Sequence, residues 1–462
     1  MSIAENATEP DTQVRRIPLS LNQEFLCMFD KGDGEGPFGP QYNIGYASRI
    51  TGAIDTGTLR AALNDIVVRH EALRTVVVRE GESGHQAIHP PRPVSLDIRD
   101  LGPHGDRDAR AEELIIDVEA GTYPADEVPL LRAVLGRFDD TDAVLVLVVH
   151  HTAADEWSMP LIMRDLAACY SARDGEPSAA IGVAPQFSDY TTWERERPAD
   201  DQAASAAYWR EQLRDAEILA LPTHHARSEG LPKSTAWQRF TIPAQVADAV
   251  TSVARETRSS PFMVFLAAYN VTLHRLTGAT DIVVMTFSSG RGQAQFHDTV
   301  GSFFNFVPLR TDLGGCTTFR DVIARTRKTC LAAYAHDIPF GQILAEAPAL
   351  MGPAATDDHA ICAFQVFRSP MPAEGDIGAA RYTEIRGRTR SQSVGGDIPD
   401  GAMWHLDMDF SGDLAGRLGY NTNLFDGERM AELITVFTET VAETVTDPDA
   451  PVVNRDASLP AQ

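Results

Sequence analysis

Residues Leu145–Leu166 read LVLVVHHTAADEWSMPLIMRDL, and this stretch decides the predicted fold. The apolar run from Ala143 to Val149 predicts a buried strand. The residues after Glu156 carry apolar side chains at helical spacing, and Asp155 takes the position of an N-cap. Strand, histidines and helix therefore form one continuous unit, which favours an α/β fold.

The two histidines end the predicted strand. Neighbouring side chains of an extended chain point to opposite faces, so we expect different roles for His150 and His151. One should support the structure inward, and the other should face a cavity, where a histidine can move a proton near neutral pH. Asp155 follows His151 by four residues and is placed to anchor the turn or to pair with an arginine. Taken alone, HHxxxD is a weak signal, and a purely structural strand end is the alternative.

The length of the chain predicts two lobes. It has 462 residues, and single hydrophobic cores stop growing near about 250–300 residues. The run SARDGEPSAAIGVAPQ, rich in Gly, Pro, Ser and Ala, favours a boundary that gives an N-terminal lobe 1–180 and a C-terminal lobe 181–462. Further predicted helices are Thr56–His70, Ala111–Val118, Ser260–Gly278 and Met430–Val441, and further predicted strands are TVVV, DIVVMTF, LDMDF and RLGYNTN.

Composition excludes several classes of partner. The net charge of −25 repels nucleic acid and anionic membrane surfaces. The N-terminus lacks the pattern of a signal peptide, and no window approaches a membrane span. The cysteines lack CxxC spacing, which indicates reduced thiols and a cytoplasmic protein. They are Cys27, Cys169, Cys316, Cys330 and Cys362.

Sequence patterns of other functional sites are either absent or lack the surroundings that such sites require. A metal site formed by the histidines and Asp155 lacks a second ligand cluster, and there is no HExxH, so we expect no metal. GxGxxG occurs at Gly34, Gly36 and Gly39, but no buried strand precedes it and Pro40 follows, which indicates a loop and no dinucleotide site. P-loop and GxSxG sequences are absent.

Seven stretches of the sequence, taken in order, resemble the recurrent motifs of condensation domains of non-ribosomal peptide synthetases. They are IPLSLNQEFLCMF from Ile17, RHEALRT from Arg69, HHTAADEWS from His150, SDYTTW from Ser188, VGSFFNFVPLR from Val300, HDIPFGQ from His336 and YNTNLFD from Tyr420. The resemblance spans nearly the whole chain. It implies two lobes similar to chloramphenicol acetyltransferase, arranged as a V-shaped pseudo-dimer with a central tunnel.

The resemblance also implies roles for single residues. His151 corresponds to the catalytic or substrate-positioning histidine, with His150 and Asp155 as supports. The motif aspartate is expected to pair with an arginine, for which Arg291 in FSSGRG is the first choice and Arg69 the second.

The expected lining of the substrate tunnel is Glu156, Trp157, Ser158 and Asn305. Glu156 departs from the glycine that most relatives have after the motif aspartate. It either stabilises the helix N-terminus or shapes the acceptor side of the tunnel.

The implied reaction is acyl transfer. The donor arrives as a thioester on the phosphopantetheine of a peptidyl carrier protein, and the enzyme itself binds no cofactor. A hydroxyl or amine of a small-molecule acceptor attacks, which gives an ester or an amide. The chain ends soon after the last motif, so we expect a free-standing enzyme that meets its carrier protein in trans. Such enzymes include those that esterify an enediyne core with a carrier-bound β-amino acid.

Two alternatives stay open on the same fold. One is epimerisation of a carrier-bound aminoacyl group, which also uses HHxxxD, and the other is a catalytically silent recruitment module. Heterocyclising relatives replace the histidines with aspartate, and plant-type acyltransferases carry DFGWG, so neither pattern fits this sequence.

Overall fold

The computed structural model describes residues 13–79, 84–176, 181–369, 371–386, 396–409 and 412–452. Helices and sheets are mixed in both halves of the chain, so the predicted α/β class is confirmed. The chain divides into two compact units. Unit 1 consists of Met1–Glu196, Gln293–Ser302 and Met371–Glu384, and unit 2 consists of Arg197–Gly292, Phe303–Pro370 and Ile385–Gln462.

Unit 1 is built on a six-stranded sheet in the order β13-β14-β2-β7-β6-β5. The strands are β2 (Asn43–Thr51), β5 (Ser95–Asp100), β6 (Leu131–Arg137), β7 (Asp142–His150), β13 (Glu374–Ile377) and β14 (Ala380–Glu384). A smaller sheet, β1-β4-β3, contains β1 (Arg15–Pro18), β3 (Thr75–Val78) and β4 (His85–Ile88). The helices are α1 (Leu21–Cys27), α2 (Thr56–Arg69), α3 (Arg107–Glu119), α4 (Ser158–Asp174) and α5 (Phe187–Arg195).

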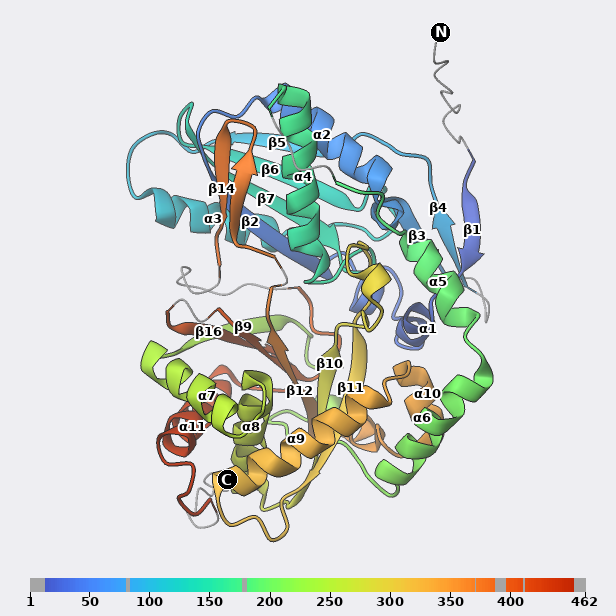
Figure 1. The fold of residues 1–462 in the computed structure, drawn as a ribbon, viewed down its shortest axis with the longest axis vertical. Coiled ribbons are helices and arrows are strands. Elements are labelled where there is room, and N and C mark those ends of the chain that lie inside the picture. The colour runs from blue at the N-terminus through green and yellow to red at the C-terminus, as the bar shows by residue number, and fades with distance from the viewer. Residues whose placement is uncertain are drawn as a thin grey trace. The chain divides into compact units, whose positions relative to one another are not determined.

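Strand β7 and helix α4 form the core of unit 1. Every residue of β7 after Asp142 is buried, which is why its sequence is one apolar run rather than an alternation. Helix α4 packs against α2 and β2 and crosses the sheet (Figure 1). It ends at Gly175, whose φ of +79° favours glycine. The predicted strand–histidine–helix unit is confirmed, and the histidines lie where β7 ends.

Unit 2 contains a five-stranded sheet in the order β8-β12-β15-β16-β9 and a two-stranded ribbon, β10-β11. The strands are β8 (Ala220–Pro222), β9 (Thr235–Ile242), β10 (Asp281–Ser288), β11 (Asn305–Asp312), β12 (His359–Phe367), β15 (Ala402–Asp407) and β16 (Leu414–Asn421). The helices are α6 (Ala199–Gln212), α7 (Ala244–Glu256), α8 (Pro261–Thr277), α9 (Phe319–Ala335), α10 (Phe340–Glu346) and α11 (Gly427–Thr446).

Aromatic side chains join the larger sheet of unit 2 to its helices. Tyr269 of α8 stacks on Phe364 of β12 with ring centroids 4.7 Å apart. Phe437 of α11 packs on Trp404 of β15 at 4.8 Å. Because these rings are buried, α8 and α11 are fixed to one face of the sheet.

The boundary between the units differs from the predicted division at residue 180. Unit 1 continues to Glu196 because α5 is bonded to the N-terminal part of the chain: Glu194 accepts a hydrogen bond from the backbone N–H of Leu21 at 2.8 Å. Two segments from the second half of the chain also belong to unit 1. Strand β14 pairs with β2, placing Arg381 opposite Thr51, so the larger sheet is completed by residues far away in sequence.

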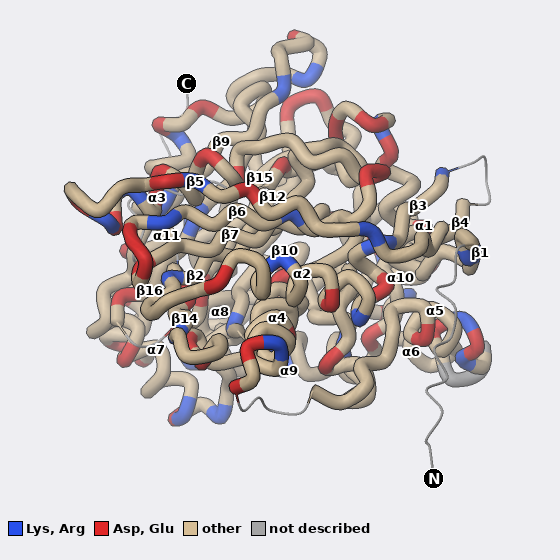
Figure 2. Tube along the Cα trace, turned by 90° about the horizontal axis from the view of Figure 1, so that it is seen from above, with Lys and Arg blue, Asp and Glu red and all other residues tan. Residues whose placement is uncertain are grey.

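Along the described part of the chain, no helix is both long and apolar enough to cross a membrane. Lys and Arg are scattered among Asp and Glu along the trace (Figure 2). Many of these charges form local ion pairs, such as Arg310 with Asp281 at 2.7 Å.

Candidate functional site

His150 is the last residue of β7 and is buried. Its Nε2–H donates to the carbonyl of Gly39 at 3.1 Å, since a carbonyl can only accept. Nδ1 then accepts from Thr152, whose hydroxyl lies 2.8 Å away. Burial lowers the pKa of His150 to about 4, more than the hydrogen bond to Gly39 raises it. The imidazole is therefore neutral and held in one tautomer at physiological pH.

His151 follows in a turn and is only partly buried. Its backbone N–H donates to the carbonyl of Tyr42 at 2.8 Å. Its ring stacks on the phenol ring of Tyr42, with centroids 4.7 Å apart and an interplanar angle of 15°. Burial lowers the pKa of His151, and hydrogen bonds with backbone groups and the charge of Asp155 oppose this effect. A neutral imidazole near pH 7 has a lone pair that can accept a proton.

Asp155 is buried at the entry to α4. Its Oδ1 accepts hydrogen bonds from the backbone N–H of Ser158 at 2.9 Å and from the Ser158 hydroxyl at 2.7 Å. The N-cap of α4 is Trp157, so the prediction that Asp155 takes the N-cap position is wrong. Asp155 instead closes the turn that leads into the helix. Its two bonds to Ser158 fix the carboxylate at the start of α4.

Ser158, expected in the substrate tunnel, is bonded to two parts of unit 1. Its side chain is fully buried, and the backbone N–H of Gly301 donates to its hydroxyl at 3.2 Å. The carbonyl of Gly301 lies 3.0 Å away and competes with Asp155 for the single hydroxyl proton. The charged, shorter acceptor, Asp155, is preferred. Ser158 therefore joins Asp155 to the segment Gln293–Ser302, and its role in the tunnel stays a prediction.

Glu156 and Trp157 lie in the turn between Asp155 and α4, and both are partly buried. The indole Nε1–H of Trp157 donates to the carbonyl of His297 at 3.0 Å. Trp157 is thus a second link to the segment Gln293–Ser302.

Arg291 and Asn305 lie in unit 2. Arg291 is buried, and its guanidinium lies 4.1 Å from the ring centroid of Phe303. The side-chain amide of Asn305 donates to Asp337 and to the carbonyl of Ile338 and accepts from the backbone N–H of Phe340. These bonds hold residues 337–340 against β11. The roles predicted for Arg291 in pairing and for Asn305 in the tunnel stay predictions.

Arg69, the second choice as partner of Asp155, is engaged elsewhere. Its Nε donates to Asp165 of α4 at 2.7 Å. His70 also bonds to Asp165 at 3.0 Å. Burial acts to raise the pKa of Asp165, but hydrogen bonds from His70 and Arg69 outweigh it and lower that pKa to about 2. This cluster secures α2 to α4.

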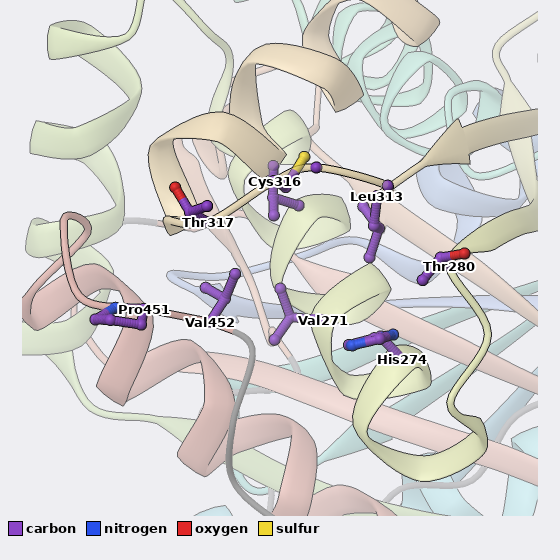
Figure 3. Close-up of a pocket in the computed structure, with 11 residues that line it drawn as sticks. Val271, His274, Thr280, Leu313, Cys316, Thr317, Pro451 and Val452 are labelled. Atoms are coloured by element: carbon purple, nitrogen blue, oxygen red, sulfur yellow. The ribbon is translucent and has the colours of Figure 1, made fainter.

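A cavity of about 390 Å³ lies within unit 2 (Figure 3). It is lined mainly by apolar residues of α8, α9 and the chain after β11, together with His274 and Pro451. None of the residues predicted for acyl transfer lines it. Within the described ranges, no three His, Cys, Asp or Glu side chains are grouped to hold a metal ion.

Sequence reasoning missed two parts of this site. The first is Tyr42, which contacts both histidines: its ring also meets that of His150 edge-on at 6.2 Å. The second is the segment Gln293–Ser302, which bonds to Trp157 and Ser158. Neither could be found from local patterns, because each contact joins residues more than a hundred positions apart.

The comparisons with known proteins cover nearly the whole chain. A family model described as the condensation domain matches residues 13–460. One polypeptide of linear gramicidin synthase from Brevibacillus parabrevis is 35% identical over 345 residues, which is 73% of this chain. The match spans only 4% of that much longer protein.

Solved structures are similar over the same range. The SgcC5 protein from Streptomyces globisporus, solved in complex with (R)-(-)-1-(2-naphthyl)-1,2-ethanediol and sucrose, is 50% identical, with a TM-score of 0.90 over 94% of this chain and 100% of that chain. The first condensation domain of the calcium-dependent antibiotic synthetase is 23% identical, with a TM-score of 0.77 over 97% of this chain and 99% of that chain. The similarity to this condensation domain shows a shared fold.

Proposed function

Because the chain belongs to the condensation domain family, whose members are acyltransferases, we propose that it transfers an acyl or aminoacyl group from a carrier protein to a small-molecule acceptor. The donor is a thioester on the phosphopantetheine of the carrier protein, and no cofactor or metal of the enzyme takes part. The observation that carries the proposal is the state of His151. It is a partly buried histidine whose pKa is lowered by burial and whose ring is held on Tyr42.

The proposed reaction uses His151 to move one proton. The acceptor oxygen or nitrogen attacks the thioester carbonyl carbon and forms the new C–O or C–N bond, while His151 takes the proton that the nucleophile loses. Collapse of the tetrahedral intermediate breaks the C–S bond, and the proton passes to the departing thiolate. The products are an ester or amide and the free phosphopantetheine thiol. A positioned base contributes about 10²- to 10⁴-fold, and holding both substrates together supplies further rate.

A hydroxyl acceptor, and hence an ester product, is the finer part of the proposal. SgcC5 is 50% identical and was solved with a vicinal diol, which favours an alcohol as nucleophile here too. An enediyne core is the acceptor class that the motif resemblance suggests.

We further propose that the carrier protein is separate from this chain and that both meet in the cytoplasm. All five cysteines are free thiols, as a reducing compartment requires. In this proposal Arg291 pairs with Asp155, and Glu156, Trp157 and Asn305 line the substrate tunnel.

The test is an assay of His151→Ala. Carrier proteins loaded with a panel of aminoacyl and acyl groups are incubated with the naphthyl ethanediol and with its 2-amino analogue, and products are identified by mass spectrometry. We expect the wild-type protein and the control His104→Ala, which changes an exposed histidine, to form product, and we expect folded His151→Ala to lose at least about 100-fold in rate. Full activity of His151→Ala would refute its role.

The assay also separates the alternatives. Deuterium exchange at the donor α-carbon without acceptor would indicate epimerisation. Binding of loaded carrier with neither product nor exchange would indicate a recruitment module. If the enzyme prefers the amino analogue to the diol, the proposed product is an amide and not an ester.

A further inference from the structure

The loop before β2 contacts both histidines of the motif. This loop contains the sequence GEGPFGPQYN, Gly34–Asn43, and thus the whole GxGxxG pattern that fits no dinucleotide site. It ends at β2, whose residue Asn43 lies directly opposite His150 in the sheet. The loop is therefore carried to the histidines by the pairing of β2 with β7.

The loop is held in one conformation by its own bonds. The backbone N–H of Tyr42 donates to the carbonyl of Gly39 at 3.0 Å, and the side-chain amide of Asn43 donates to the carbonyl of Pro40 at 2.7 Å. Gly39 has no room for a side chain, since a Cβ there would lie 2.6 Å from the Cα of Glu35. The same Gly39 carbonyl accepts from Nε2 of His150. One rigid loop thus fixes His150 and presents Tyr42.

Tyr42 holds His151 at two points. Its carbonyl accepts the backbone N–H of His151 at 2.8 Å, which fixes the main chain. Its ring lies nearly parallel to the imidazole, 4.7 Å away, which fixes the plane of the reactive ring. Tyr42 is itself buried, so its ring has little freedom to move. We propose that Tyr42 is a positioning residue for His151, which orients the imidazole and stabilises its protonated form.

The chemistry of an aromatic face explains the second part of this role. The face of a phenol ring carries partial negative charge and attracts a cation by about 0.5–1 kcal/mol at exposed sites and more when water is excluded. When His151 takes a proton from the acceptor, the imidazolium that forms lies against this face. The contact is then stronger than it was with the neutral ring, so it favours the charged state through which the reaction passes.

This inference rests on the proposed function for its kinetic part only. The ring-to-ring contact also predicts a property of His151 that is measurable without any substrate. Removal of the aromatic ring should lower the pKa of His151 further, because the imidazolium then loses its attraction to the ring face. Burial, which already lowers this pKa, remains. The other titratable groups that face His151, namely Asp155 and His150, stay the same in every variant.

The experiment compares Tyr42→Phe, Tyr42→Leu and a control. Phe keeps the ring, whereas Leu removes it, and Tyr42→Met fills the space without a ring should Tyr42→Leu fail to fold. The control is Phe38→Leu, which removes a buried ring from the same loop that packs against Arg79. The readouts are the pKa of His151 by NMR titration, with His151→Asn to assign the signal, and kcat and KM for product formation.

We expect Tyr42→Leu to lower the His151 pKa by about half a unit to one unit and kcat by about three- to tenfold, which matches about 0.7–1.4 kcal/mol, with KM changed less than kcat. Tyr42→Phe should keep the acid dissociation constant of His151 and kcat each within about twofold of the wild-type values. Phe38→Leu should lower Tm and leave the pKa unchanged.

Three results would overturn the inference: an unchanged His151 pKa in both ringless variants, an equal loss in Tyr42→Phe, or an equal pKa shift in Phe38→Leu. If wild-type protein forms no product with any donor, the proposed function fails. The NMR titration still decides the role of Tyr42 in that case.

Discussion

The hydroxyl of Ser158 lies 2.7 Å from Oδ1 of Asp155, and both side chains are buried at the start of α4. The same hydroxyl accepts the backbone N–H of Gly301, a residue contributed by the second half of the chain. Gly301 lies so close to the ring of Phe187 that a side chain would collide with it. The serine that bonds to the motif aspartate is therefore also bonded to the segment Gln293–Ser302.

We predict that Ser158→Ala impairs catalysis through Asp155. The substitution removes a hydrogen bond to a charged group, which contributes about 1.5–3 kcal/mol, and it leaves the N–H of Gly301 without its acceptor. We expect kcat to fall by about ten- to a hundredfold and Tm to fall as well. Steady-state kinetics and thermal unfolding measure the two effects.

The matched control is Ser171→Ala in the same helix. Ser171 is also buried, and its hydroxyl bonds to Ala167 and to the backbone N–H of Gly378, far from the histidines along α4. Ser171→Ala should lower Tm without lowering kcat. If Ser158→Ala loses only as much activity as Ser171→Ala, Ser158 has no role beyond stability.

Burial of His150 predicts a dependence of stability on pH. Its pKa is about 4 in the folded chain, and an unfolded histidine titrates near 6.5. Between these values the unfolded chain binds a proton that the folded chain does not, so the free energy of unfolding falls as pH is lowered through this window. Above about pH 6.5 both states are neutral and the contribution is fully present.

The measurement is chemical unfolding of wild type and His150→Gln at pH 7 and pH 5. Gln keeps an amide donor for the Gly39 carbonyl but does not titrate. From pH 7 to pH 5 wild type should lose about 2 kcal/mol more than the variant. His151 and the buried His70 are still present in His150→Gln, so their contributions cancel in the comparison. An equal loss in both proteins would show that His150 is not the source.

Local signals were sufficient to predict many elements of the fold. Helix α8 follows Ser260, which accepts a hydrogen bond from Met263, begins at Pro261 and ends at Gly278 with φ of +73°, as the sequence predicts. The pairing of β14 with β2 could not be predicted, because short strands carry no local mark of their partners. The predicted boundary at residue 180 placed α5 in the C-terminal lobe for the same reason. Helix α5 bonds to Leu21 and Gln86, which lie more than a hundred residues earlier in the sequence.

The candidate site shows the same limit. His150 ends the buried strand that the apolar run predicted, whereas His151 lies in the turn that follows, so the two histidines have different surroundings. The contact of Tyr42 with His151 depends on β2 pairing with β7 in one register. Ser158 was expected in the tunnel because of its position in the motif, but its burial depends on a segment far along the chain.

We predict that Glu156 affects the choice of acceptor. It is partly buried in the turn before α4, at the position where the motif resemblance implies glycine. Glu156→Gly should change the ratio of kcat/KM for two acceptors of different size by at least about threefold, or roughly 0.7 kcal/mol. Glu156→Gln removes the charge but keeps the size, so it separates the two causes. An unchanged ratio with a lowered Tm in Glu156→Gly would leave helix stabilisation as the role of Glu156.

The proposed pairing of Asp155 with Arg291 predicts energetic coupling. Both side chains are buried, and removal of one partner of a buried ion pair strands the other charge. Double-mutant cycles with Asp155→Ala and Arg291→Ala should give a coupling energy of about 1–3 kcal/mol in unfolding free energy. Arg69→Ala supplies the matched cycle, because Arg69 is bonded to Asp165 instead. We expect Asp155 and Arg69 to be additive within about 0.5 kcal/mol. Additivity of Asp155 with Arg291, or equal coupling in the two cycles, would contradict the pairing.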